Sequence, residues 1–297
     1  MELRIEDVSK TYSNGVRALD GVSLTIPQGM FGLVGPNGSG KTTLMRTIAT
    51  LQEPDGGAAR LGDVDVLADK EAVRRLLGYL PQEFGVYPNL SAETLLSHLA
   101  TLKGITVPGD RKKVVEAILH RTNLWSDRKK KLGGFSGGMK QRFGIAQALL
   151  GNPQLIIVDE PTAGLDPEER SRFLNLLSEI GENVIVILST HIVDDVAEVC
   201  SRMAIIREGR VLHAGEPQAA IEDIRGRTWR KSIERSELPQ YERNHSVIST
   251  RLRGGRTIIH VLSNDRPDET FEQAVPDLKD VYFIKLSEGN GSNWAGR

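Results

Sequence analysis

The chain has 297 residues, which is long enough for one large domain and a small second one. Its 38 Lys and Arg residues nearly balance 39 Asp and Glu residues, and the resulting net charge of −1 argues against wholesale nucleic-acid binding. A single cysteine, Cys200, excludes an internal disulfide, and without a signal peptide or a bilayer-length apolar run we expect a soluble cytoplasmic protein.

The first part of the chain alternates between apolar and polar side chains, most regularly over residues 22–26. This alternation, with Asn14-Gly15 as a turn signal, predicts an antiparallel β layer that residues 60–61 continue. Tyr12 lies between the predicted strands, where its ring either packs within the layer or stacks on a base.

The strongest chemical signal is a glycine-rich loop between an apolar strand, residues 30–34, and a helix whose apolar positions recur over residues 44–51. Residues 53–57 are expected to end that helix. The glycines let several backbone N–H groups converge on one anion, and the helix N-terminus adds positive partial charge. We expect Lys41 to reach terminal phosphates and the Thr42 hydroxyl to bind Mg²⁺. The loop consists of Gly35, Pro36, Asn37, Gly38, Ser39, Gly40, Lys41, Thr42 and Thr43.

The middle of the chain is predicted to be helical. A short strand at residues 78–82 ends at Gln82, and helical patterns then run from residue 91 to residue 150, with Ser91 and Asp110 as candidate N-caps. A helical block between two strand-rich halves predicts an inserted subdomain, about residues 88–152. Its outer surface would be free for a partner.

A second candidate anion site lies at the start of the last helix in this block, at Ser136-Gly137-Gly138. A serine hydroxyl and two glycine N–H groups at a helix start can bind phosphate, and the same triplet is also an ordinary helix cap. Because the chain already carries one phosphate loop, we interpret the triplet as a second phosphate site.

Two later apolar strands end in polar residues. The strand at residues 155–158 leads into Asp159 and Glu160, which suggests a Mg²⁺ ligand and a base that orients water, since phosphoryl transfer needs both. The strand at residues 183–188 leads to His191, which we interpret as functional because open parallel sheets bind ligands at the carboxyl ends of their strands. The other histidines are interpreted as surface or structural residues: His98, His120, His213, His245 and His260.

The last quarter of the chain carries no phosphate or metal motif. Its pattern predicts a β-α-β-β-α-β order, which would suit a small ferredoxin-like appendage. The expected strands are residues 227–233, 245–252, 257–262 and 281–286, the expected helices lie near residues 237–243 and 269–274, and residues 288–297 are expected to form a flexible tail.

In this order the motifs resemble those of the ATP-binding cassette (ABC) family, over residues 3–217. The matching segments are Tyr12 for the base-stacking aromatic, residues 35–43 for Walker A, Gln82 for the Q-loop, residues 136–139 for the signature, residues 155–160 for Walker B, residues 163–166 for the D-loop and His191 for the switch histidine.

The resemblance implies an enzyme that binds ATP and Mg²⁺ and hydrolyses ATP. It implies that Lys41 binds the β and γ phosphates, and that Thr42, Gln82 and Asp159 surround Mg²⁺, partly through water. The whole phosphate loop and Tyr12 would then hold the nucleotide.

The resemblance also assigns the catalytic steps and a dimer. It implies that Glu160 polarises the attacking water and that His191 holds the γ-phosphate. Ser136, Gly137 and Gly138 would act in trans, closing on ATP bound by a second copy of the chain or a homologous subunit.

Phe135 and Met139 depart from the family's commonest signature, which has Leu and Gln at these places. The resulting Gly-Gly-Met-Lys-Gln-Arg variant resembles ATPases that pair with separately encoded ABC-2 type permeases, many of them exporters. The resemblance therefore implies a peripheral subunit at the inner face of the cell membrane, bound to integral membrane permease subunits. From the balanced charge we expect no nucleic-acid partner.

The predicted fold class is α/β: a P-loop ABC ATPase core with a mixed or parallel sheet and an antiparallel β layer, an inserted helical subdomain and a small α+β C-terminal appendage. Residues 1–222 would form the nucleotide-binding domain and residues 223–297 the appendage. Two other functions are alternatives. The first is a non-transport ABC ATPase that acts on ribosomes or DNA. DNA-acting members of the family carry a long coiled coil between Walker A and the signature, where this sequence has a short helical block, and ribosome-acting members usually have two cassettes, where this sequence has one. A P-loop kinase or GTPase leaves Ser136-Gly137-Gly138 without a role.

Overall fold

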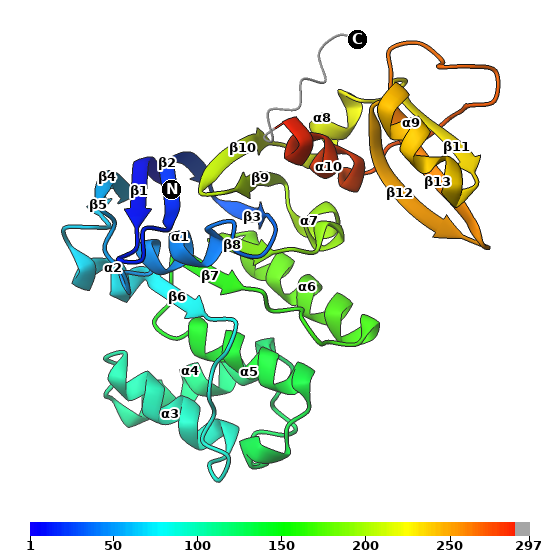
Figure 1. The fold of residues 1–297 in the computed structure, drawn as a ribbon. Helices are drawn as coiled ribbons and strands as arrows, with labels where there is room; N and C mark the ends of the chain where they lie inside the picture. The colour runs from blue at the N-terminus through cyan, green and yellow to red at the C-terminus, as the bar shows by residue number, and fades with distance from the viewer. Residues whose placement is uncertain (289–297) are drawn as a thin grey trace.

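The computed structural model describes residues 1–288 (Figure 1). Apart from Glu288, the tail expected at residues 288–297 lies outside the described residues. Within them, no helix is long and apolar enough to cross a bilayer.

A six-stranded sheet forms the centre of the molecule, in the order β10-β9-β3-β8-β7-β6. Strands β6, β7, β8, β3 and β9 pair in parallel, and β10 is antiparallel to β9. The predicted parallel sheet is therefore present, and Glu208 and Gly209 form the turn between β9 and β10. The strands are β3 (Gly29–Val34), β6 (Leu77–Leu80), β7 (Leu155–Asp159), β8 (Ile185–Thr190), β9 (Arg202–Arg207) and β10 (Arg210–Gly215).

The predicted antiparallel layer is a separate sheet in the order β2-β1-β4-β5. Its first two strands pair with Leu3 opposite Ile26 and Ile5 opposite Leu24, as the alternation of apolar residues predicts. The strands are β1 (Glu2–Thr11), β2 (Arg17–Pro27), β4 (Gly56–Leu61) and β5 (Val64–Asp65).

The central strands are buried on both faces, which explains their continuous apolar runs. In β7, Leu155 and Ile157 pack with the antiparallel layer and with the helix α1 (Lys41–Ile48). Ile156 and Val158 face the opposite core, which the helices α6 (Pro167–Gly181) and α7 (Val193–Val199) cover. The period of two along the strand thus divides its side chains between two cores.

Helix α1 is shorter than predicted. The apolar spacing indicated a helix to Leu51, but α1 ends at Ile48, and Leu51 is exposed. Thr50 adopts a left-handed φ of 59°, which turns the chain away from the helix axis. The two glycines expected to stop the helix, Gly56 and Gly57, instead begin β4.

The predicted helical block is present as α3 (Ala92–Leu102), α4 (Pro108–Arg121) and α5 (Gly137–Ala148), with α2 (Lys70–Leu76) before it and a short 3₁₀ turn, η1 (Leu132–Gly134), inside it. Ser91 caps α3 as predicted, because its Oγ accepts a hydrogen bond from the N–H of Thr94 at 3.2 Å. The predicted cap at Asp110 is wrong. Pro108 starts α4 two residues earlier, where its missing N–H costs nothing.

The C-terminal region contains a third sheet, in the order β12-β13-β11-β14, but not the predicted element order. Residues 269–274, predicted as a helix, contain a short strand, and residues 281–286, predicted as a strand, lie in a helix. The ferredoxin-like order is therefore wrong. The elements are α8 (Pro217–Glu222), β11 (Thr228–Ile233), η2 (Arg235–Glu237), α9 (Leu238–Asn244), β12 (Val247–Arg253), β13 (Arg256–Leu262), β14 (Glu272–Gln273) and α10 (Leu278–Glu288).

The physical reason for α10 is its packing. Leu278, Val281 and Tyr282 follow helical spacing and are buried, together with Ile284, in the same core as Cys200 of the large domain. Figure 1 draws α10 between the C-terminal strands and the end of the central sheet formed by β9 and β10. The last described helix thus packs against the large domain.

We expect Ile284→Ala to lower the free energy of unfolding of the large domain by about 2–5 kcal/mol, because it leaves a cavity in a core shared with the central sheet. Phe283→Ala, on the same helix and 43% exposed, is the control and should cost clearly less. Denaturant unfolding of both variants tests this. Equal losses would contradict the assignment of α10 to this core.

Candidate functional site

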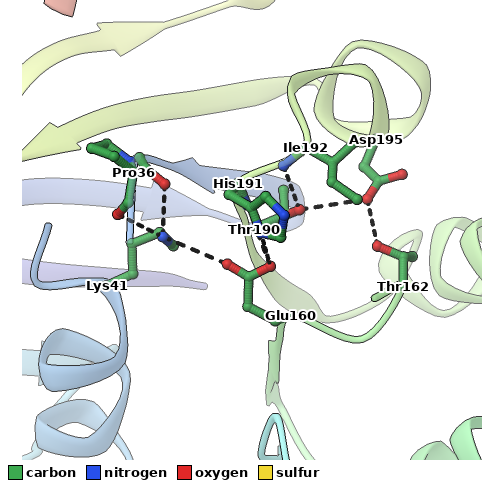
Figure 2. Close-up of polar contacts among 9 residues, drawn as sticks. Pro36, Lys41, Glu160, Thr162, Thr190, His191, Ile192 and Asp195 are labelled. Atoms are coloured by element: carbon green, nitrogen blue, oxygen red, sulfur yellow. Dashed lines mark hydrogen bonds and ion pairs between the residues drawn. The ribbon is translucent and has the colours of Figure 1, made fainter. Parts of the chain in front are cut away.

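The predicted site residues follow three adjacent strands. In the sheet, Val34 of β3 lies opposite Thr190 of β8, and Asp159 of β7 lies opposite Ser189 of β8. Because the strands are parallel, the loops that follow them emerge at one edge of the sheet. The glycine-rich loop, Glu160 and His191 therefore meet there, although they are remote in sequence (Figure 2).

Lys41 is folded back into the glycine-rich loop. Its ammonium group donates to the carbonyl oxygens of Gly35 at 2.7 Å and of Pro36 at 3.2 Å, and the side chain is only 5% exposed. Burial lowers the pKa of Lys41, while the carboxylate of Glu160, whose Oε1 lies 3.5 Å away, opposes that shift. Lys41 thus supplies a buried positive charge beside free helix N–H groups, since α1 has no side-chain cap at its N-terminus.

Glu160 contacts residues from the segments that follow the two neighbouring strands, Lys41 after β3 and His191 after β8. Its Oε2 lies 2.6 Å from Nδ1 of His191 and 3.4 Å from the backbone nitrogen of the same residue, while Oε1 faces Lys41 (Figure 2). Its backbone has a left-handed φ of 49°, and its N–H donates to the carbonyl of Ser189 at 2.8 Å. A non-glycine residue in this region costs about 1–3 kcal/mol, and such strain concentrates at functional sites.

Asp159 is more deeply buried than its neighbour Glu160, which is 7% exposed. Asp159 is 1% exposed, and both of its carboxylate oxygens lack a hydrogen-bond partner of good geometry. Burial raises the pKa of Asp159, and the nearby hydroxyls of Ser189 and Thr42 oppose that shift. An unpartnered buried carboxylate beside a threonine hydroxyl fits a divalent cation such as Mg²⁺, which prefers oxygen ligands.

A cavity of about 510 Å³ opens at this edge, within the range of small-molecule sites. The Tyr12 hydroxyl is held by Thr43 Oγ1 at 3.1 Å and Gln52 Oε1 at 3.0 Å, so its ring stays at the cavity wall. The residues lining the cavity are Tyr12, Val16, Ala18, Asn37, Gly38, Ser39, Gly40, Lys41, Thr42, Thr43, Gln82, Glu160 and His191. A larger cavity, of about 650 Å³, borders none of the predicted site residues.

The predicted second anion site is not part of this cavity. Ser136 is the N-cap of α5, with its Oγ accepting from the N–H of Met139 at 3.2 Å. Ser136 and Gly137 are exposed, whereas Gly138 is buried, and none of the three lines the cavity. Within one copy of the chain this helix start is therefore exposed at the surface and lies outside the cavity.

The sequence did not single out Asp195, a fully buried carboxylate beside Thr162 and Thr190 (Figure 2). It follows Asp194 in the first turn of α7, where acidic residues are common because they complement the helix dipole. Nothing in the sequence distinguishes the buried acid from its exposed neighbour. Val16 and Ala18, which line the cavity, also carried no signal.

Comparison with known proteins decides the family. The chain is 32% identical over 306 residues to the uncharacterized ABC transporter ATP-binding protein YxlF of Bacillus subtilis, covering 95% of this chain and 98% of that protein. The chain belongs to the ABC transporter ATP-binding proteins. The ABC transporter family model matches residues 19–163, which confirms the resemblance drawn from the motifs.

Two further comparisons support the assignment of this chain to the ABC ATPases. The daunorubicin/doxorubicin resistance ATP-binding protein DrrA of Streptomyces peucetius is 36% identical over 208 residues, covering 69% of this chain and 62% of that protein. The dimeric structure of the ATP-binding cassette MJ0796 in a post-hydrolysis state with ADP and Pi superposes with a TM-score of 0.65 at 28% identity, covering 72% of this chain and 98% of that one. The predicted fold class and the prediction of an ATPase are confirmed.

We expect Gly40→Ala to weaken ATP binding and lower the melting temperature. A Cβ at this position would lie 2.4 Å from the Ala18 carbonyl oxygen, and its φ of 105° is open mainly to glycine. Gly38→Ala is the matched control: its φ is 77°, its Cβ would meet no atom within 4 Å, and it carries only a backbone cost of about 1–2 kcal/mol. Nucleotide titration and thermal unfolding measure both, and equal effects would contradict the clash.

Proposed function

We propose that this ABC ATPase is the motor subunit of an exporter, in which ATP hydrolysis at the described edge drives a separate membrane permease. The observation that carries the proposal is Glu160, held between Lys41 at 3.5 Å and His191 at 2.6 Å on the wall of the 510 Å³ cavity. A base, a cation and a histidine that converge on one cavity are the parts that phosphoryl transfer to water requires.

The nucleotide site would use local backbone groups. The N–H groups of residues 35–43 would cradle the phosphates, Lys41 would turn from its carbonyl partners to the β and γ phosphates, and Tyr12 would stack on the base. Asp159, Thr42 and Gln82 would hold Mg²⁺, partly through water. When bound, the ion neutralises the charge that develops on the phosphates. The unpartnered oxygens of Asp159 support this assignment.

The catalytic roles follow from the contacts of Glu160. Its carboxylate would orient the attacking water and accept its proton, while His191 would hold the γ-phosphate. The 2.6 Å hydrogen bond fixes the relative orientation of the two side chains before ATP binds. Such preorganisation reduces the rearrangement needed at the moment of reaction.

The exposed start of α5 supports a dimer. Ser136, Gly137 and Gly138 would close on ATP bound by a second copy of the chain or a homologous subunit, because an exposed helix N-terminus next to a hydroxyl is a ready anion site. The similar MJ0796 cassette is described as dimeric.

A permease partner and the direction of transport rest on relatives. DrrA is named for daunorubicin and doxorubicin resistance, which favours export and favours transport over work on ribosomes or DNA. The chain would lie in the cytoplasm, peripheral at the inner face of the membrane, with the helical subdomain near Gln82 as the surface for the permease. Recovery with ribosomes or DNA, and with no membrane protein, would contradict this.

Replacing the proposed base gives a direct test. Glu160→Gln should retain ATP binding but lower the hydrolysis rate by about 10²- to 10⁴-fold, because it removes the proton acceptor. It should also lengthen the life of an ATP-bound dimer in size-exclusion chromatography. Glu182→Gln, at an exposed position outside the cavity, is the control. Hydrolysis by Glu160→Gln at the wild-type rate would refute the role of Glu160.

Lys41→Ala tests the phosphate contact. We expect ATP affinity to fall by about 10- to 100-fold, since a charge-assisted hydrogen bond contributes about 1.5–3 kcal/mol. Lys70→Ala is a suitable control, because Lys70 pairs with Glu53 at the surface. Calorimetric titration with a non-hydrolysable ATP analogue gives the result, and unchanged affinity would argue against the assignment.

A further inference from the structure

Asp195 is a buried carboxylate that joins several segments of the site without lining the cavity. The residue is 0% exposed, and it lies in the first turn of α7. Its side chain accepts hydrogen bonds from three elements: the loop after β7, the end of β8 and helix α6. A carboxylate withdrawn from water in this way is retained only where its partners hold it well.

The contacts divide between the two carboxylate oxygens, and the ones from Thr162 and Arg170 are short. Thr162 Oγ1 donates to Oδ2 at 2.6 Å, and Thr190 Oγ1 lies 3.5 Å from the same oxygen (Figure 2). Arg170 Nε donates to Oδ1 at 2.5 Å and supplies the compensating charge. Thr190 Oγ1 also accepts the N–H of Ile192 at 2.9 Å, so the turn after β8 is fixed on both sides of His191.

These partners adjoin the residues of the proposed reaction. Thr162 follows Glu160 by two positions, and Thr190 directly precedes His191. Arg170 lies on α6, whose N-cap is Asp166, the last residue of the D-loop. One buried side chain therefore ties together the loop of Glu160, the loop of His191 and the helix that begins at the D-loop.

We infer that Asp195 is a positioning residue for ATP hydrolysis, which fixes the loops of Glu160 and His191 so that their 2.6 Å contact is maintained; this rests on the roles proposed for those two residues. Glu160 has a strained backbone, and such a conformation persists only when the surroundings over-determine it. The bond from Thr162 to Asp195 is such a constraint.

The first test is Asp195→Asn. The asparagine side chain has one acceptor oxygen, so it cannot accept from Thr162 and Arg170 on separate oxygens. We expect kcat to fall by about 10- to 100-fold, the range found when the support of a functional group is lost, while the affinity for ATP stays unchanged because the phosphate loop is not touched. Asp194→Asn, which removes only the surface pair with Lys279, is the matched control and should keep the wild-type kcat.

A second pair of variants separates positioning from folding. Thr162→Val keeps the shape of the side chain and removes the hydroxyl, so it should lower kcat as Asp195→Asn does. Thr162→Ser keeps the hydroxyl and should therefore keep kcat close to the wild-type value. Because both act on one contact, Thr162→Val combined with Asp195→Asn should lower kcat little further. This pair remains informative if Asp195→Asn does not fold.

The outcomes are distinct. Wild-type kcat in folded Asp195→Asn and Thr162→Val, or an equal loss in Thr162→Ser and Thr162→Val, would overturn the inference and leave Asp195 a residue for stability alone. Glu160→Gln, measured alongside, tests the proposed function separately. Hydrolysis at the wild-type rate by Glu160→Gln refutes the proposed base, whereas an inactive Glu160→Gln with a fully active Asp195→Asn refutes only the positioning role.

Discussion

The site depends on the parallel register of β3, β8 and β7, because that register brings segments remote in sequence to one edge of the sheet. Val34 lies opposite Thr190 and Asp159 opposite Ser189, so the three loops begin side by side. Neighbouring strands are about 4.8 Å apart, which sets the scale of the contacts between those loops. The strands are buried on both faces, and a slip by one residue would exchange two different cores. Packing of the core thus fixes the relative positions of the three loops that form the site.

The charges at this edge call for two ligands, one cationic and one anionic. Lys41 and Glu160 partly compensate each other at 3.5 Å, but the buried Asp159 has no hydrogen-bond partner. Burial disfavours unpaired charges, as the raised pKa of Asp159 and the lowered pKa of Lys41 indicate. A divalent cation beside Asp159 and a polyphosphate on the loop would satisfy both groups. This electrostatic demand agrees with an ABC ATPase better than with a binding site for a neutral molecule.

The sequence predicted what is local and missed what depends on distant partners. The glycine-rich loop, the strand ending at Asp159 and the turn before His191 each carry their signal within a few residues, and the structure brings them together. The extent of α1 was misjudged because the turn at Thr50 ends the helix although the apolar spacing continues. The strand predicted at residues 281–286 is a helix, because the helical face includes Leu278 and becomes apparent only where it packs on the large domain.

Asp195 shows the same limit at the level of one side chain. Asp194 and Asp195 are adjacent and chemically identical, yet Asp194 reaches Lys279 of α10 at 2.6 Å, while Asp195 reaches Thr162 at 2.6 Å. Only the orientation of α7 on the sheet separates a surface ion pair from an internal one. Because α10 packs against α7, this short helix has the C-terminal region on one side and the loops of the site on the other. The packing of α7, which the sequence does not predict, therefore connects the C-terminal region with the loops of the site.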